Sequence, residues 1–179
     1  MHPQKRVMAL INVVGGLAVL GSYAYGLYTN PHTRLEIWGG VPESLKPFYT
    51  ASMLLAAAGY FAFTYFIFFR VDAENARIGG QYDVRLFNAL YVAILGPSAL
   101  WMPMTFEVLY NPTDGLWFVI RVVLAIVGFA SLGLIYALLK LDPRLPPFSY
   151  WLAVAGAIAF AVQTALLDAL VWPAYFPAL

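Results

Sequence analysis

Residues 116–139 read LWFVIRVVLAIVGFASLGLIYALL, an apolar run in which Arg121 is the single charged side chain. A helix needs about 20 predominantly apolar residues to cross the roughly 30 Å hydrocarbon core of a bilayer, and this run is long enough. Polar and apolar residues do not alternate along it, as they do in the strands of a membrane barrel. The stretch therefore predicts a transmembrane helix.

Four further segments have the same character: 7–28, 48–69, 86–106 and 150–172. Across the chain, 62% of residues are hydrophobic and 11% charged, whereas a soluble domain carries about 25% charged residues. The first segment is longer than a signal-peptide core of about 7–15 residues, so we expect it to be retained. The sequence predicts an all-α integral membrane protein, with residues 1–179 forming a single bundle of five transmembrane helices.

The basic residues are distributed unevenly between the two ends of the predicted bundle. If the N-terminus is cytoplasmic, the outer segments hold only Arg34 and Lys46. The inner segments then hold Lys5, Arg6, Arg70, Arg77, Arg85, Lys140 and Arg144. The positive-inside rule favours this orientation, with the C-terminus on the opposite side. We expect a multi-pass protein of a bacterial inner membrane or an organelle membrane.

The longest connection, 29–47, lies on the predicted outer side. Its three prolines and the Gly39-Gly40 pair rule out one continuous helix. Its apolar residues are too many for a solvated linker: Leu35, Ile37, Trp38, Val41 and Leu45. We expect the segment to fold back over the bundle, either as an interfacial anchor with Trp38 at the lipid headgroups or as a lid over a cavity.

Small and polar residues within the spans indicate how the helices pack. Alanine recurs at every fourth position of the fifth segment: Ala153, Ala157, Ala161, Ala165 and Ala169. Such a stripe lets a neighbouring backbone approach closely, either within the bundle or across a homodimer seam. Asn12 and Asn88 are expected to form hydrogen bonds across the bundle.

Two charged residues are predicted at a similar depth in the outer leaflet. Arg121 lies about one and a half turns from the outer end of its segment, and Asp168 about one turn from the end of the next. Because an isolated charge is costly in lipid, we expect them to form an ion pair. That pair would either lock the fourth helix to the fifth or belong to a functional site.

Aromatic and polar residues also gather toward the outer half of the predicted bundle. Trp38 would cap a pocket in which Tyr23, Tyr49 and Trp101 stack on an apolar ligand. The residues expected to orient the polar end of that ligand are Glu107, Arg121, Gln163 and Asp168.

The sequence carries no recognisable catalytic or metal-binding pattern. It contains no cysteine, and its two histidines lie outside the spans, so thiolate and helix-borne histidine sites lack ligands. A net charge of +1 gives no indication of a nucleic-acid partner. We expect a protein that is not an enzyme, and any cofactor remains unknown.

One stretch resembles a known family. Residues 99–106, ALWMPMTF, are similar to the Asn-x-Leu-Trp-x-Pro-x-Phe-Phe stretch of the TspO/translocator protein family, and residues 47–50, PFYT, are a weaker match. Ser98 stands where the family has asparagine, and Leu167-Asp168 replaces its Leu-Asn pair. The resemblance implies five helices and a long first loop covering a pocket for porphyrins, sterol-like molecules or other hydrophobic ligands.

Together these features favour a membrane protein that binds a hydrophobic or amphipathic small molecule of the porphyrin, sterol-like or isoprenoid class. The pocket is expected between the helices, in the outer leaflet. Two alternatives stay open at this point. One is an accessory subunit of a larger membrane complex, and the other is a small transporter that depends on a carboxylate such as Asp168 or Glu107.

Overall fold

The computed structural model describes residues 2–143 and 147–176. Within them, five helical spans are long and apolar enough to cross a membrane: Pro3–Thr29, Lys46–Arg70, Arg85–Tyr110, Asp114–Leu139 and Phe148–Tyr175. The predicted five-helix architecture is confirmed to this extent. Arg144, which was counted in the charge distribution, and residues 1 and 177–179 of the predicted domain lie outside the described residues.

The spans are built from mainly α-helical elements: α1 (Pro3–Thr29), α2 (Lys46–Tyr65), α3 (Arg85–Tyr110), α4 (Asp114–Leu139), α5 (Pro147–Ala161) and α6 (Trp172–Tyr175). Two of the spans include wider π-helical turns, η2 (Phe66–Arg70) after α2 and η3 (Val162–Val171) between α5 and α6. α3 runs without a break through Pro97 and Pro103.

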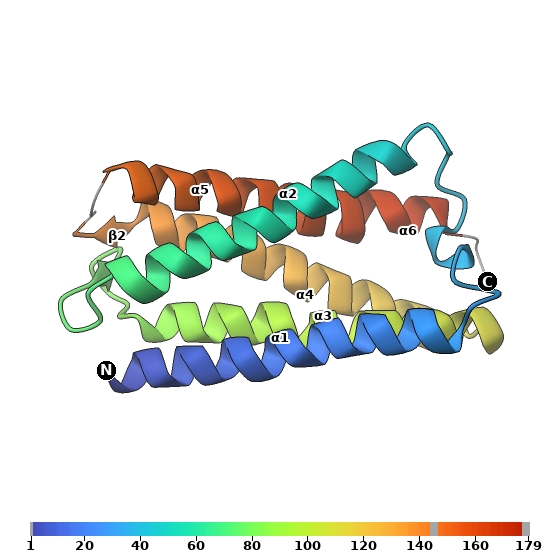
Figure 1. Cartoon of the computed structure of the whole chain (residues 1–179), viewed down its shortest axis with the longest axis horizontal. Helices are drawn as coiled ribbons and strands as arrows, with labels where there is room; N and C mark the ends of the chain where they lie inside the picture. Colours follow the sequence, from blue (N-terminus) through green and yellow to red (C-terminus); the bar gives the residue numbers. More distant parts are fainter. Residues whose placement is uncertain (1, 144–146, 177–179) are drawn as a thin grey trace.

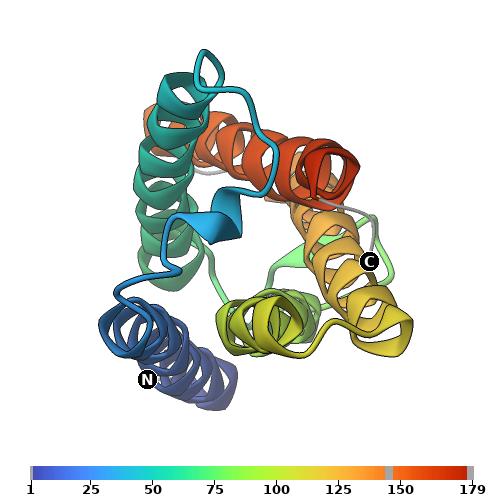
Figure 2. The same cartoon turned by 90° about the vertical axis from the view of Figure 1, so that its right-hand side faces the viewer.

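The helices lie side by side along the long axis of the molecule (Figure 1), and an end-on view shows them arranged in a ring (Figure 2). α2 packs against α5, α5 and η3 against α4, α4 against α3, and α3 against α1. α1 is the most peripheral, since only 6% of its most apolar stretch is buried, against 50% for α4. The ring is therefore most weakly closed between α1 and α2.

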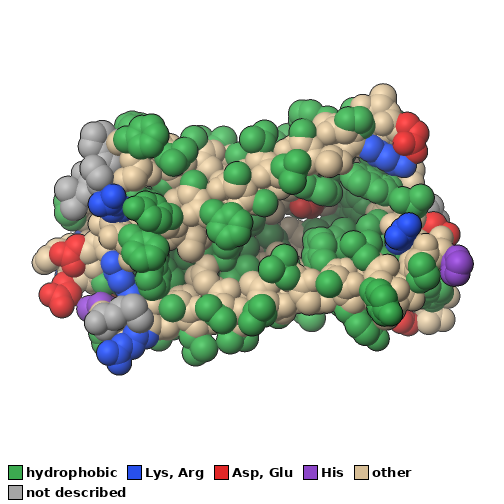
Figure 3. Space-filling view, in the orientation of Figure 1, with side chains coloured by type: hydrophobic (Ala, Val, Ile, Leu, Met, Phe, Trp, Pro, Cys, Tyr) green, Lys and Arg blue, Asp and Glu red, His purple; other side chains and the backbone are tan. Residues whose placement is uncertain are grey.

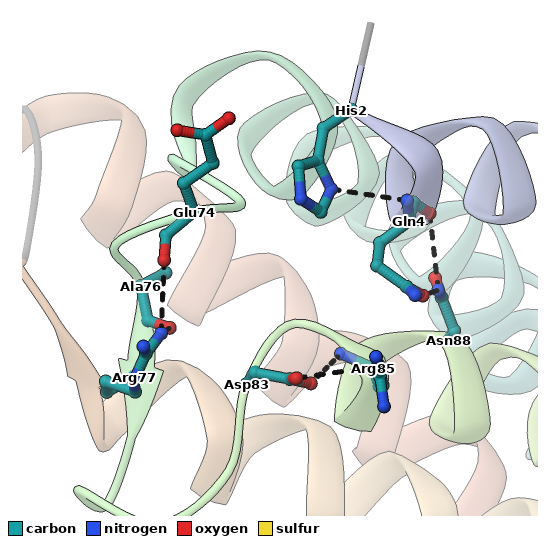
Figure 4. A network of polar contacts seen from close by, with 8 residues as sticks. All are labelled: His2, Gln4, Glu74, Ala76, Arg77, Asp83, Arg85 and Asn88. Carbon is teal, nitrogen blue, oxygen red and sulfur yellow. Dashed lines mark hydrogen bonds and ion pairs between the residues drawn. The ribbon is translucent and has the colours of Figure 1, made fainter.

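The end that holds the N-terminus, called the inner end here, is closed by polar contacts and a short sheet (Figure 4). β1 (Arg77–Ile78) pairs antiparallel with β2 (Leu141–Asp142), which ties together the two inner connections. The Asn88 amide donates hydrogen bonds to the Gln4 backbone oxygen and side-chain oxygen at 3.3 and 3.0 Å. The expected bond from Asn88 across the bundle is thus confirmed.

A dense hydrophobic cluster fills the inner half. Phe63, Phe87 and Tyr91 are fully buried there. The Tyr60 hydroxyl on α2 donates to the Asn12 side-chain oxygen on α1 at 2.5 Å, which confirms the second expected asparagine contact. These contacts hold α1 to α2 in the inner half of the molecule.

Two glycines set the distance between α2 and α5. A Cβ atom built on Gly156 would lie 2.8 Å from the Gly59 Cα, closer than real Cβ contacts come. Ala153 and Ala157 of the predicted alanine stripe are fully buried in the inner cluster. This part of the stripe therefore serves packing within the chain.

Candidate functional site

The opposite, outer half contains a hollow. Figure 3 shows it opening between α1 and α2 toward the end that carries the 29–47 loop, with hydrophobic side chains around it and acidic atoms at its back. The opening faces sideways, where the lipid of a membrane would lie. It coincides with the weakly closed position in the ring of helices.

The first loop lies across the outer end of the bundle. Its single turn of 3-10 helix, η1 (Glu36–Trp38), sits among the helix ends in Figure 2. The Trp172 indole nitrogen donates a hydrogen bond to the Ile37 carbonyl at 2.9 Å, and the Gly40 amide donates to the Tyr175 carbonyl at 2.7 Å. Gly39 has φ +56°, a conformation that favours glycine. The loop is thereby attached to the C-terminal end of the fifth span.

The predicted aromatic residues do meet at this end. The Trp38 and Tyr49 rings are 6.0 Å apart edge to face, and the Tyr23 and Trp101 rings are 5.7 Å apart. The Tyr49 hydroxyl donates to the Leu167 carbonyl at 3.3 Å. Aromatic side chains from the loop, α1, α2 and α3 therefore line one region.

Gln163 and Asp168 are brought together by the π-helical turns of η3. In an α-helix, residues five apart point about 140° away from each other. The i→i+5 pattern of a π-helix places them on one face instead. The Gln163 side-chain amide consequently donates a hydrogen bond to the Asp168 carboxylate at 2.7 Å.

Asp168 faces the interior of the outer half. It lies within electrostatic range of the hydroxyl groups of Tyr23 on α1 and Tyr49 on α2. These two helices border the opening of the hollow (Figure 3). Asp168 therefore presents its carboxylate to the same space as the aromatic rings.

The predicted ion pair between Arg121 and Asp168 is wrong. Within the described residues, the ion pairs join Lys46 to Glu43 and Arg85 to Asp83. Arg121 is exposed. An arginine on the exposed face of α4 needs no buried partner, and no ion pair among the described residues joins it to Asp168.

Glu107 also differs from the expectation. Its side chain is exposed and accepts a hydrogen bond from the Asn111 amide at 2.8 Å, in the last turn of α3. No hydrogen bond or ion pair among the described residues joins it to Asp168 or Gln163. Of the predicted polar residues, Gln163 and Asp168 form the cluster, whereas Glu107 and Arg121 lie outside it.

Two buried polar atoms of this half have no hydrogen-bond partner within the described residues. They are the indole nitrogen of Trp101 and the side-chain oxygen of Gln163. Gln163 is 5% exposed, so water does not readily compensate it. Buried polar groups are ordinarily paired, and an unpaired one costs about 1–3 kcal/mol.

Three aromatic residues of the outer cluster were missed as site residues. The Trp172 ring lies 5.6 Å from Trp101 and 4.7 Å from Phe176, and Trp117 stacks on Phe176 at 5.0 Å. From the sequence alone, residues 172–176 are typical of an aromatic anchor at a membrane surface. The sequence signal that could have identified them is that their positions fall at the same predicted end of the bundle as Trp38 and Trp101.

Comparison of the chain with protein-family models, with curated proteins and with solved structures gives no match.

Proposed function

We propose that this chain spans a membrane five times and binds a hydrophobic or amphipathic small molecule in the hollow between α1 and α2. The N-terminus is cytoplasmic in this proposal, and the hollow lies in the outer leaflet beneath the 29–47 loop. The molecule belongs to the porphyrin, sterol-like or isoprenoid class, in line with the resemblance to the TspO/translocator protein family.

The observation that carries the proposal is the pair of unpaired buried atoms, Trp101 Nε1 and Gln163 Oε1, in the half of the bundle that contains the hollow. Small-molecule sites are typically apolar and aromatic, with a few convergent polar groups. A ligand with both an apolar body and polar atoms would satisfy these unpaired groups. Tyr23 is 36% exposed and lies against Trp101, so its ring is available for contact with a ligand.

The shape of the site supports entry from the membrane. The hollow opens sideways between α1 and α2 (Figure 3), while the loop covers the end of the bundle (Figure 2). A lipid-soluble molecule could therefore reach the aromatic rings without first crossing into water. The loop then acts as the lid, with Trp38 held against Tyr49.

Ligand-dependent thermal unfolding of the purified protein tests the proposal with protoporphyrin, cholesterol and a carotenoid. A ligand at 100 times its dissociation constant stabilises the folded state by about 2.7 kcal/mol. We expect at least one of the three to raise Tm in the wild type and to lose this effect in Trp101→Ala. Trp151→Ala is the matched control, because Trp151 is exposed at the inner end.

Two results would contradict the proposal. One is the absence of stabilisation by all three ligands, and the other is an equal loss of stabilisation in Trp101→Ala and Trp151→Ala.

The orientation can be tested by thiol labelling. Because the sequence contains no cysteine, an introduced cysteine is the single site that reacts. His32→Cys places one thiol in the 29–47 loop, and Gln81→Cys places one in the inner connection after β1; both positions are exposed. In intact cells, we expect a membrane-impermeant maleimide to label His32→Cys and to spare Gln81→Cys until the cells are permeabilised. The reverse labelling pattern would refute the orientation.

A second candidate function is an accessory subunit of a larger membrane complex. A groove of about 460 Å³ between α4 and η3 favours it, because the groove is lined by small and apolar residues such as Gly128 and Ala165. A partner helix fits such a surface. Recovery of a stoichiometric partner after purification in a mild detergent would support this role, and a lone monomer would count against it.

A further inference from the structure

Asp168 has no cationic partner in the part of the chain that the structure describes. Its single recorded side-chain hydrogen bond comes from the neutral amide of Gln163. Arg121 is exposed, and Lys46, whose ammonium lies 5.9 Å from the Trp38 ring, pairs with Glu43. The carboxylate thus faces an aromatic hollow without a balancing charge.

Such a carboxylate is unusual inside a membrane span. Ionisable residues at membrane depth are rare, and most are paired with one another or with backbone groups. Asp168 lies well inside the span that ends at Tyr175. Asp168 also lies in a π-helical segment. Such segments are rare, and they are frequently found at functional sites.

The neighbouring polar atom is an acceptor as well. Gln163 uses its amide nitrogen to hold Asp168 Oδ1, which leaves Gln163 Oε1 buried and unpaired. Asp168 Oδ2 has no hydrogen bond within the described residues. The two oxygens therefore call for a ligand group that donates hydrogen bonds.

The surrounding aromatic rings favour a positive charge on that donor. Tyr23 and Trp101 lie together on one side, and Tyr49 comes from α2 on another. The face of an aromatic ring is electronegative and attracts ammonium groups within about 6 Å. A neutral carbonyl ligand would use neither the ring faces nor Gln163 Oε1.

We propose that the site selects lipophilic amines: an ammonium group donates to Asp168 Oδ2 and Gln163 Oε1, and an apolar body lies against Tyr23 and Trp101. This inference rests on the proposed function, in which an amphipathic molecule occupies this hollow, and it specifies the polar group of that molecule as an amine. The ammonium supplies the positive charge that Asp168 lacks, and the apolar body occupies the opening between α1 and α2.

The experiment compares two molecules of nearly equal shape, diphenylpropylamine and diphenylpropanol. Binding is measured by titration calorimetry with the full chain in nanodiscs of phosphatidylcholine, with empty nanodiscs as the blank. A zwitterionic lipid is chosen because anionic lipids would concentrate the amine by themselves. We expect the amine to bind the wild type at least about tenfold more tightly than the alcohol, since hydrogen bonds to charged groups are the stronger ones.

Asp168→Asn removes the charge while keeping the shape of the side chain. We expect it to reduce the preference for the amine to within about threefold and to leave alcohol binding unchanged. Glu107→Gln is the matched control, because Glu107 is an exposed acid near the outer end, and it should preserve the preference.

If Asp168→Asn does not fold, Gln163→Leu provides a second route. It retains the carboxylate but removes both the unpaired oxygen and the amide that holds Asp168 Oδ1, and we expect it to weaken amine binding about three- to tenfold with little effect on the alcohol. An equal loss for both molecules would overturn the proposal.

The remaining outcomes separate this inference from the proposed function. Equal binding of amine and alcohol, unaffected by Asp168→Asn, overturns the selection of amines but retains a pocket. Stabilisation by a porphyrin or a sterol without any amine binding also overturns the selection of amines and retains the pocket. Failure of every ligand overturns both.

Discussion

The inner and outer halves of this bundle are built from similar residues but differ in how those residues are paired. Both contain tyrosines and amides between the helices. In the inner half, the Tyr91 hydroxyl bonds to Thr64 at 2.8 Å and the Tyr60 hydroxyl bonds to Asn12. In the outer half, Trp101 Nε1 and Gln163 Oε1 are buried without partners.

This difference indicates that the inner half satisfies most of its buried polar groups within the chain, whereas the outer half has polar groups that a ligand could pair. The inner cluster places fully buried rings of Phe63 and Tyr91 in contact across α2 and α3, 6.2 Å apart. One inner atom, Asn88 Oδ1, is also unpaired, but its amide nitrogen forms two bonds to Gln4. We infer that stability is concentrated in the inner half and recognition in the outer half.

The largest expected effect is the loss of an inner aromatic ring. Phe63→Ala should lower the free energy of unfolding by about 3–5 kcal/mol, because it leaves a cavity in the closely packed inner cluster. Tyr23→Ala, in the outer half, should cost less than about 1 kcal/mol in the ligand-free protein, because that ring is 36% exposed. Thermal unfolding in one detergent measures both. Equal losses would remove the distinction between the halves.

A smaller effect is expected where α2 crosses α5. Gly59→Ala should destabilise the protein by about 1–3 kcal/mol, because the added methyl group would meet the backbone of Gly156. Gly16→Ala on α1 is the control: nothing lies within 4 Å of its added Cβ. That variant should be neutral or up to about 1 kcal/mol more stable. A tolerated Gly59→Ala would mean that the two helices are not held at this distance.

Removal of single hydroxyl groups sharpens the comparison further. Tyr60→Phe leaves the Asn12 oxygen without its partner and should cost about 1–2 kcal/mol. Tyr23→Phe removes a hydroxyl that has no recorded hydrogen bond within the described residues, and it should change stability by less than about 0.5 kcal/mol. Chemical unfolding of the two variants in parallel measures both changes in the free energy of unfolding. A larger loss for Tyr23→Phe would reverse the assignment of roles.

The smallest expected effect on stability concerns the inner connection between η2 and α3. The Asn75 side chain and the Glu74 backbone donate hydrogen bonds to Asp72 and hold its pKa below the usual value. Because the folded-state pKa is lowered, this contribution to stability is present above about pH 3.9 and is lost as the pH falls through the lowered value. In an NMR titration, Asn75→Ala should raise the pKa of Asp72. An unchanged pKa would contradict the role of the Asn75 bond.

The helices could be predicted because the signal for a membrane span is local. Apolar length alone places 86–106 in a helix, and the structure extends that helix to Arg85–Tyr110 because polar residues at its ends remain helical. The same local signal placed Arg121 and Asp168 within helical spans, as the structure has them. It could not give the direction of their side chains, since that depends on which neighbours each helix face contacts.

The π-helical turns of η3 explain much of what the sequence could not predict about the site. Gln163 and Asp168 were both suspected as ligand-binding residues, but their separation by five positions argues against contact in a regular α-helix. The contact exists because the backbone widens over Val162–Val171. No residue pattern in that segment signals the widening.

The placement of the tryptophans makes this protein its own optical probe. Of its five tryptophans, Trp38, Trp101, Trp117 and Trp172 belong to the outer cluster, and Trp151 lies in α5 near the inner end. The Trp101 and Trp117 rings are 5.6 and 5.7 Å from Trp172, close enough for excitation to pass between them. With Trp151 replaced by phenylalanine, tryptophan emission would come from the outer end alone. Binding of a ligand in the hollow would then change the emission wavelength and the fluorescence intensity of the unlabelled protein.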